Sequence, residues 1–108
     1  SVEPNQIDTR NVHQRRVLLG ICRRLRKEEE ISSGDARKLY ELVCEENNEE
    51  ARGYTTFWKY LKHLESQGLI VSRASSSHRG RGRTQYITMP NSVPAVIGDR
   101  IEKGLLEG

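Results

Sequence analysis

The sequence predicts a mainly α-helical fold that carries a small β-hairpin. Several stretches repeat apolar residues at helical spacing, at residues 11–27, 33–46, 55–67 and 94–106. Two short stretches rich in β-branched and aromatic residues, at 69–74 and 86–89, flank a segment rich in Ser, Gly and Arg. With 108 residues and 34% apolar content, the chain is expected to form one domain with a lean core.

The first predicted helix covers about residues 11–27. Asn11 is expected to cap it, with Gln14 three residues later in an arrangement that resembles a capping box. The core-facing stripe consists of Leu18, Ile21, Cys22 and Leu25. Most of the arginines are expected off that stripe, namely Arg15, Arg16, Arg23, Arg24 and Arg26.

Two further helices are predicted before the hairpin. Residues 30–32 could form a very short strand, and Ser32 or Ser33 can cap a helix that ends before Asn47. Its stripe consists of Ala36, Leu39, Tyr40, Val43 and Cys44. The next helix is expected from about Thr55 to Gly68, a residue suited to a helix C-terminus. Its buried stripe consists of Phe57, Leu61 and Leu64, with Trp58 packing beside it.

The hairpin strands are expected at 69–74 and 86–89, joined by the loop 75–83. A last helix is expected to begin near Pro94 and to bury Ile97, Ile101 and Leu105. The order of helix, short strand, two helices, hairpin and helix is that of a winged helix-turn-helix with an added C-terminal helix. We therefore expect a lead-in at 1–10, a winged-helix domain at 11–89, and a helix at 90–108 packed on the same domain.

Charge is unevenly distributed along the chain. Residues 52–83 carry seven Lys or Arg against one acid, whereas residues 28–51 carry two against nine. This pattern suggests one face for a polyanion and another face turned away from it. Unevenly solvated helix faces would give the same pattern.

The helix at 55–67 is the candidate recognition helix of this fold. When its apolar stripe faces inward, Thr55, Lys59, Lys62 and Ser66 face outward. Arg52 and His63 flank that face, and Tyr54 can support the helix start or touch the DNA backbone. Lys and hydroxyl side chains suit a helix in the major groove, although an ordinary amphipathic helix has similar residues on its solvated face.

The loop after the first hairpin strand is the candidate wing. Arg79, Arg81 and Arg83 alternate with Gly80 and Gly82, and arginine suits a narrow, negative minor groove. Groups that can donate to phosphates come before them, at Ser75, Ser76, Ser77 and His78, and Arg73 lies on the strand that leads into the loop. A hairpin tip without DNA contacts is the alternative.

Motifs for catalysis or metal binding are missing from the sequence. His13, His63 and His78 are scattered, while Cys22 and Cys44 fall on apolar stripes and are expected as reduced core residues. Neither a metal-binding His or Cys motif nor a phosphate-binding Gly-rich loop is found. We expect no enzyme activity, cofactor, metal, small-molecule substrate or membrane span in this chain.

One stretch of the sequence resembles a known family. Residues 54–61, Leu64-Glu65 and 68–70 resemble the helix-into-strand segment of archaeal origin-recognition (cell-division-control type) replication initiators. Residues 82–87 resemble the end of their wing, and 13–19 the start of their first helix. The resemblance implies a C-terminal domain that follows an AAA+ ATPase module and binds origin repeats. It also implies DNA contacts by Thr55, Thr56, Lys59 and Lys62 on the helix and by Arg79, Arg81 and Arg83 on the wing.

The expected function is therefore binding of double-stranded DNA at replication origins, in the cytoplasm and associated with the nucleoid. Two alternatives remain open at this point. A transcription regulator of the same fold would dimerise through the helix at 94–106, and a protein-interaction module would expose an apolar or acidic recognition face.

Overall fold

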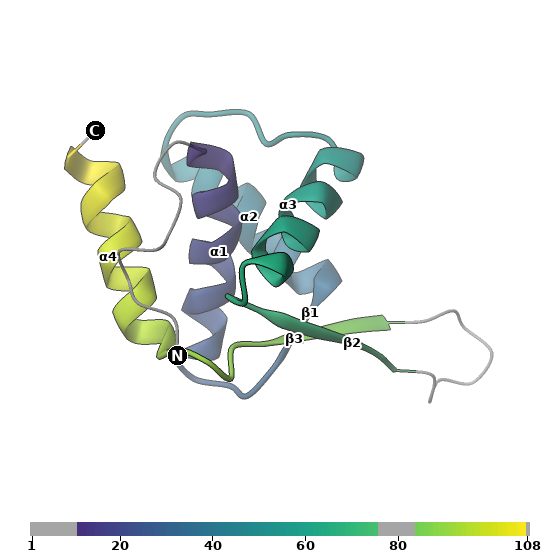
Figure 1. The fold of residues 1–108 in the computed structure, drawn as a ribbon. Coiled ribbons are helices and arrows are strands. Elements are labelled where there is room, and N and C mark those ends of the chain that lie inside the picture. Colours follow the sequence, from purple (N-terminus) through teal and green to yellow (C-terminus); the bar gives the residue numbers. More distant parts are fainter. Residues whose placement is uncertain (1–10, 76–83, 108) are drawn as a thin grey trace.

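The computed structural model describes residues 11–75 and 84–107, and it contains the predicted order of elements (Figure 1). The helices and strands are α1 (Val12–Leu25), β1 (Ile31–Ser32), α2 (Ser33–Glu46), α3 (Tyr54–Ser66), β2 (Val71–Ser75), β3 (Thr84–Thr88) and α4 (Pro94–Glu107). The prediction of a winged helix-turn-helix with an added C-terminal helix is confirmed.

The helix ends follow the predicted capping residues. The Asn11 side chain accepts a hydrogen bond from the backbone N–H of Gln14 at 2.9 Å, and Ser32 accepts one from Asp35 N–H at 3.1 Å. Gly68 has a φ of +79°, which a glycine adopts without strain, just beyond the end of α3. Only half of the expected capping box at Asn11 forms, because the Gln14 side chain bonds to residues near the end of α3 instead.

The three strands form an antiparallel sheet in the order β1-β3-β2. Ile31 of β1 pairs with Ile87, and β2 pairs with β3 from Val71–Thr88 to Ser75–Thr84. The first hairpin strand was predicted from residue 69, but it begins two residues later. The side chains of Leu69 and Ile70 are buried in the core, so this turn after α3 contributes packing and no strand pairing.

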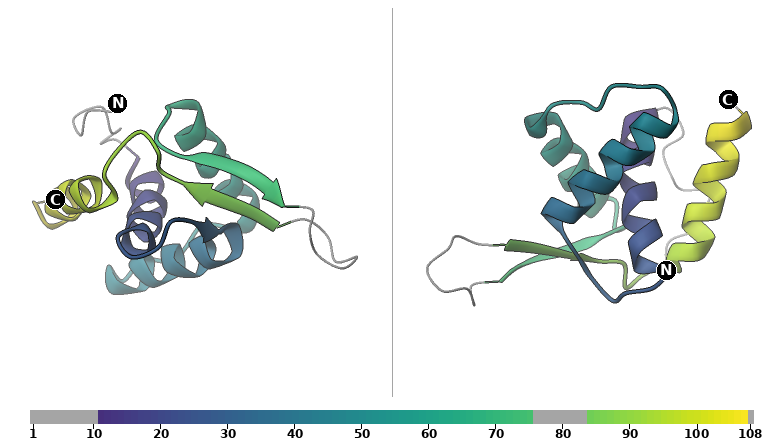
Figure 2. Two further views of the ribbon diagram at one scale, coloured as in Figure 1. Left: turned by 90° about the horizontal axis from the view of Figure 1, so that it is seen from below. Right: turned by 180° about the vertical axis from the view of Figure 1, so that it is seen from behind.

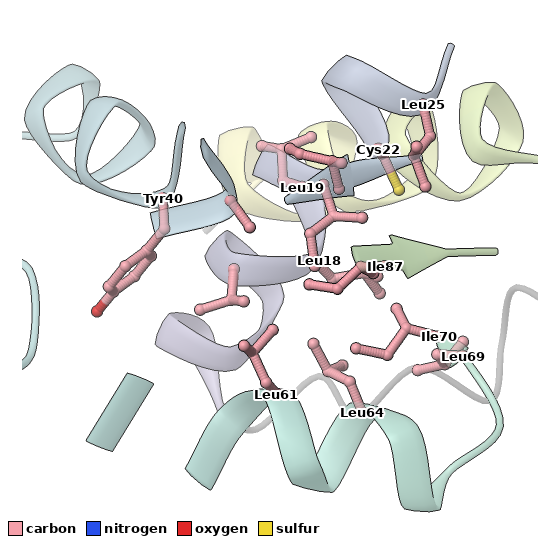
Figure 3. Packing of buried hydrophobic residues seen from close by; sticks show 14 of the residues in the cluster. Leu18, Leu19, Cys22, Leu25, Tyr40, Leu61, Leu64, Leu69, Ile70 and Ile87 are labelled. Atoms are coloured by element: carbon pink, nitrogen blue, oxygen red, sulfur yellow. The ribbon is translucent and has the colours of Figure 1, made fainter. Parts of the chain in front are cut away.

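Helix α1 lies at the centre of the core, in contact with α2, α3 and α4 (Figures 1 and 2). Every residue from 13 to 22 is buried, including Leu18 and Leu19. Leu61 and Leu64 of α3 and Ile87 of β3 lie in the same cluster as these two leucines (Figure 3). Cys22 and Cys44 are buried free thiols, as predicted.

The arginines of α1 and of its C-cap, Arg26, are buried or form ion pairs. Arg15 and Arg16 are only 8% and 7% exposed, because neighbouring helices cover faces of α1 that lie off the apolar stripe. The later arginines form ion pairs with Glu46 (2.7 Å from Arg23), Asp35 (3.4 Å from Arg24) and Asp99 (2.7 Å from Arg26). Arg23, Arg24 and Arg26 therefore connect helices and are not a free surface for a polyanion.

Helix α4 packs along α1, across the molecule from α3 (Figure 2). It begins at Pro94, as predicted, and buries Ile97 and Ile101. The predicted burial of Leu105 concerns a side chain outside the described part. The position of α4 leaves α3 and the sheet as neighbours on the other side of α1.

Candidate nucleic-acid interface

Helix α3 has the orientation about its own axis that the apolar pattern predicts. Phe57, Leu61 and Leu64 are buried against the core. The opposite side is exposed, and it carries Thr55, Lys59, Lys62 and Ser66. Two ammonium groups and two hydroxyls thus lie along one solvent-facing side of a 13-residue helix.

The start of α3 combines a cationic residue with aromatic rings. Arg52 is exposed, and Tyr54 is 55% exposed in the first turn. The Tyr54 ring lies 6.3 Å from the ring of Trp58, which in turn makes an edge contact with Phe57 at 6.2 Å. Trp58 is half-buried and packs against the core, as predicted, and Thr56 is also half-buried.

The end of α3 is bound to α1 through polar side chains. The His63 Nδ1–H group donates to the side-chain oxygen of Gln14 at 2.6 Å, and the Gln14 amide donates to Gln67 at 3.1 Å. The Ser66 hydroxyl donates to the backbone carbonyl of His63 at 2.7 Å. His63 and Ser66 are exposed, but these polar groups already bond to other groups of the protein. The sequence did not indicate the His63 contact, since Gln14 was expected to cap its own helix.

At the base of the hairpin, Arg73 already has protein partners. Its guanidinium bonds to Glu30 at 2.9 Å and lies 5.5 Å from the centre of the Tyr86 ring. Ser75 is the half-buried last residue of β2. The other predicted wing residues lie outside the described part of the chain, namely Ser76, Ser77, His78, Arg79, Gly80, Arg81, Gly82 and Arg83.

A cavity of about 220 Å³, which the sequence pattern does not predict, opens between α3 and the sheet. Leu61, Ile70 and Ile87 form part of its apolar lining, and the Lys62 side chain also borders it. Glu65, the one acid of residues 52–83, lines it as well and accepts hydrogen bonds at 3.3 Å from both the N–H and the hydroxyl of Ser72. The Glu65 carboxylate therefore joins α3 to β2.

The described residues contain neither a metal-binding cluster nor a membrane-spanning helix. Within 11–75 and 84–107, no three His, Cys, Asp or Glu side chains are grouped so that they could hold a metal ion. None of the described helices has the length and apolar character needed to cross a membrane.

Comparison with known proteins identifies the family. Residues 5–96 match the model of the Cdc6 C-terminal winged helix domain. This range includes α3 and both strands of the hairpin. The chain belongs to this family. That membership favours a replication protein over the transcription regulator that the sequence left open, and it confirms the resemblance noted above.

The similar curated proteins are archaeal. The chain is 35% identical over 78 residues to an ORC1-type DNA replication protein of Methanosphaera stadtmanae, covering 72% of this chain and 20% of that relative. It is 34% identical over 98 residues to the ORC1-type DNA replication protein 2 of Aeropyrum pernix, covering 88% of this chain and 23% of that relative. The chain thus spans about a fifth of the length of these Cdc6-family relatives.

Solved structures of the family have the same fold. Cdc6p from Pyrobaculum aerophilum superposes with a TM-score of 0.82 at 24% identity, over 99% of this chain and 27% of that one. The ORC2 protein of Aeropyrum pernix superposes with a TM-score of 0.75 at 26% identity, over 99% of this chain and 26% of that one. Both superpositions extend over α4 as well as over the helices and strands before it.

Proposed function

We propose that this Cdc6-type winged helix binds duplex DNA during replication, with α3 in the major groove and the hairpin at the adjacent minor groove. The observation that carries the proposal is the exposed basic and hydroxyl-bearing side of α3. The names of the relatives add support, because they describe DNA replication proteins.

The chemistry of α3 suits contacts in the major groove. Lys59 and Lys62 lie on the exposed side, within reach of a guanine edge or a phosphate, and Thr55 adds a hydroxyl near the helix start. Arg52 comes just before the helix, where a guanidinium can bind the DNA backbone. We assign a smaller role to His63 and Ser66, because they already bond within the protein.

The hairpin supplies the second set of contacts. Strands β2 and β3 project beyond the helices, and their ends at Ser75 and Thr84 are paired (Figure 1). The eight residues that join these ends include Arg79, Arg81 and Arg83. Glycines between the arginines allow a close approach to DNA, and a narrow minor groove attracts guanidinium groups.

We further propose that any ATPase activity belongs to another part of the whole protein. This chain has no phosphate-binding Gly-rich loop in its sequence, and its relatives are several times longer. The natural location of such a protein is the cytoplasm, with the chromosome. In the whole protein, the winged helix would provide DNA binding beside an AAA+ module.

Two double variants that have the same net charge test the proposal. Lys59→Ala with Lys62→Ala removes two exposed charges from α3, and Arg100→Ala with Lys103→Ala removes two from the exposed side of α4. Fluorescence anisotropy with a labelled duplex should show about a tenfold or larger loss of affinity for the α3 variant only. Equal losses for the two variants would contradict binding through α3.

A further inference from the structure

The residue that leads into α3 has both of its backbone polar groups bound by side chains of α2. The Arg37 guanidinium donates to the carbonyl oxygen of Arg52 at 2.7 Å. The backbone N–H of Arg52 donates to the Tyr40 hydroxyl at 2.8 Å. The backbone of Arg52 is thereby fixed from two directions.

Arg37 is itself held firmly. Its guanidinium carbon lies 5.5, 5.6 and 5.4 Å from the ring centres of Tyr40, Tyr54 and Phe57, respectively. Its Nε–H group donates to Glu41 at 3.0 Å, one turn along α2. A guanidinium among three rings is attracted by their π electrons, and the ion pair limits its rotation.

Tyr40 is equally constrained. It is fully buried, its ring stacks on Phe57 at 5.7 Å, and its hydroxyl lies 2.8 Å from His13 Nδ1 of α1. The hydroxyl that receives the Arg52 N–H is therefore fixed by contacts with α1 and α3 as well as by its own helix.

The start of α3 needs such contacts because its own cap is weak. The N-cap residue is Gly53, which makes no side-chain hydrogen bond to the first turn. Glycine also leaves the backbone free to adopt many directions at this junction. Without contacts from outside, the first turn of α3 and the Arg52 side chain would vary in direction.

We propose that Arg37 and Tyr40 are positioning residues that fix the start of α3, and with it Arg52, in the orientation that DNA binding requires. The proposal rests on the proposed function, since the first turn of a recognition helix is the part nearest the bases. Neither side chain has to touch DNA, and both act through the backbone of Arg52.

Amide hydrogen exchange tests the fixed backbone without any DNA. Tyr40→Phe keeps the ring but removes the hydroxyl that accepts the hydrogen bond from the Arg52 N–H group. We expect the Arg52 amide to exchange about five- to tenfold faster, while the amides of Ile97 and Ile101 keep their rates. An unchanged rate at Arg52 would overturn the proposal, whatever the protein binds.

DNA affinity tests the consequence, with a matched charge control. Arg37→Met keeps an unbranched chain but removes the donor to Arg52, and Lys38→Met removes one exposed charge at the next residue of α2. We expect Arg37→Met to bind duplex DNA about five- to tenfold more weakly than Lys38→Met, at a temperature where both are folded.

The outcomes separate the two proposals. Equal affinities of Arg37→Met and Lys38→Met would overturn the positioning role while leaving DNA binding intact. If the parent chain binds no duplex, the proposed function fails, and the exchange rate of the Arg52 amide alone decides whether the start of α3 is fixed by α2.

Discussion

Individual side chains decide which side of α3 faces the solvent. Leu61 is 5% exposed at the middle of the buried stripe, between Phe57 and Leu64. Lys59, two residues before Leu61, and Lys62, the residue after it, are exposed. Burial of Leu61 and exposure of the lysines follow from the same orientation of α3 about its axis. A test of Leu61 therefore also tests which side of α3 is available for the proposed DNA contacts.

Leu61→Ala should lower the free energy of unfolding by about 2–5 kcal/mol, because it removes buried methyl groups and leaves a cavity. The matched variant Leu42→Ala shortens a leucine that is 45% exposed on α2 and should cost clearly less. Urea unfolding followed by circular dichroism measures both. Similar losses would show that α3 is turned differently about its axis.

His13 is a buried titratable side chain that the sequence left without a role. Burial lowers its pKa below the ordinary value of 6.5, and the nearby charges of Arg52 and Arg16 lower it further, while Glu49 opposes them. Tyr40 and Cys44 of α2 face the same ring, at 2.8 and 3.9 Å from Nδ1. The neutral imidazole is therefore the form that suits the folded protein.

A lowered folded-state pKa makes stability depend on pH in one direction. The contribution of neutral His13 to the free energy of unfolding is fully present above about pH 6.5, and it is lost as the pH falls from there through the folded-state pKa. We expect His13→Asn to flatten the decline in unfolding free energy between about pH 6.5 and 5, above the range where most carboxylates titrate. A decline of the same steepness in parent and variant would exclude this role.

At the scale of elements, local sequence signals predicted most of the fold. Asn11, Ser32 and Gly68 marked helix ends by chemistry that acts within one turn, and apolar spacing gave the buried side of each helix. The burial of Arg15 and Arg16 could not be predicted, because periodicity along α1 does not show that other helices cover it on several sides.

The candidate site was predictable to a smaller extent, for the same reason. The exposed side of α3 follows from its apolar stripe, so Thr55, Lys59 and Lys62 could be named from the sequence. The contacts of Arg37 with Arg52, and of Gln14 with His63, join residues 15 and 49 positions apart. Such contacts depend on how helices pack, and no local pattern encodes them.

The crossing of α1 and α2 depends on a residue without a side chain. A Cβ atom at Gly20 would lie 3.0 Å from the backbone nitrogen of Tyr40 and 3.1 Å from the carbonyl carbon of Leu39. Overpacking costs about 1–3 kcal/mol, and the better helix propensity of alanine offsets at most about 1 kcal/mol. Because the close atoms belong to the backbone and cannot rotate away, the cost lies at the upper end, and we expect Gly20→Ala to destabilise the domain by about 2 kcal/mol.

Gly34→Ala provides the control in the first turn of α2, where an added Cβ has no atom within 4 Å. We expect it to leave the melting temperature unchanged or to raise it slightly, through a less flexible unfolded chain. A melting temperature for Gly20→Ala as high as that of Gly34→Ala would contradict the close approach of α1 and α2 at Gly20.

At the scale of the whole molecule, the positive charges near the end of α1 are paired with acids, whereas those on the outer side of α3 are exposed. The arginines at the end of α1 pair with acids of α2 and α4, whereas Lys59 and Lys62 on α3 are exposed with Glu65 as the one acid of their stretch. A small net charge of +3 is thus compatible with a concentrated positive surface. Binding of DNA to that surface should release counterions.

The most direct test of this account is the salt dependence of duplex binding, measured by anisotropy for the parent and the double variant Lys59→Ala with Lys62→Ala. If about five phosphates are neutralised, the logarithm of the association constant should fall against the logarithm of salt concentration with a slope of about −4 to −5. The double variant should reduce the steepness by about two. A flat dependence for the parent, or equal slopes for both proteins, would contradict DNA binding through the exposed side of α3.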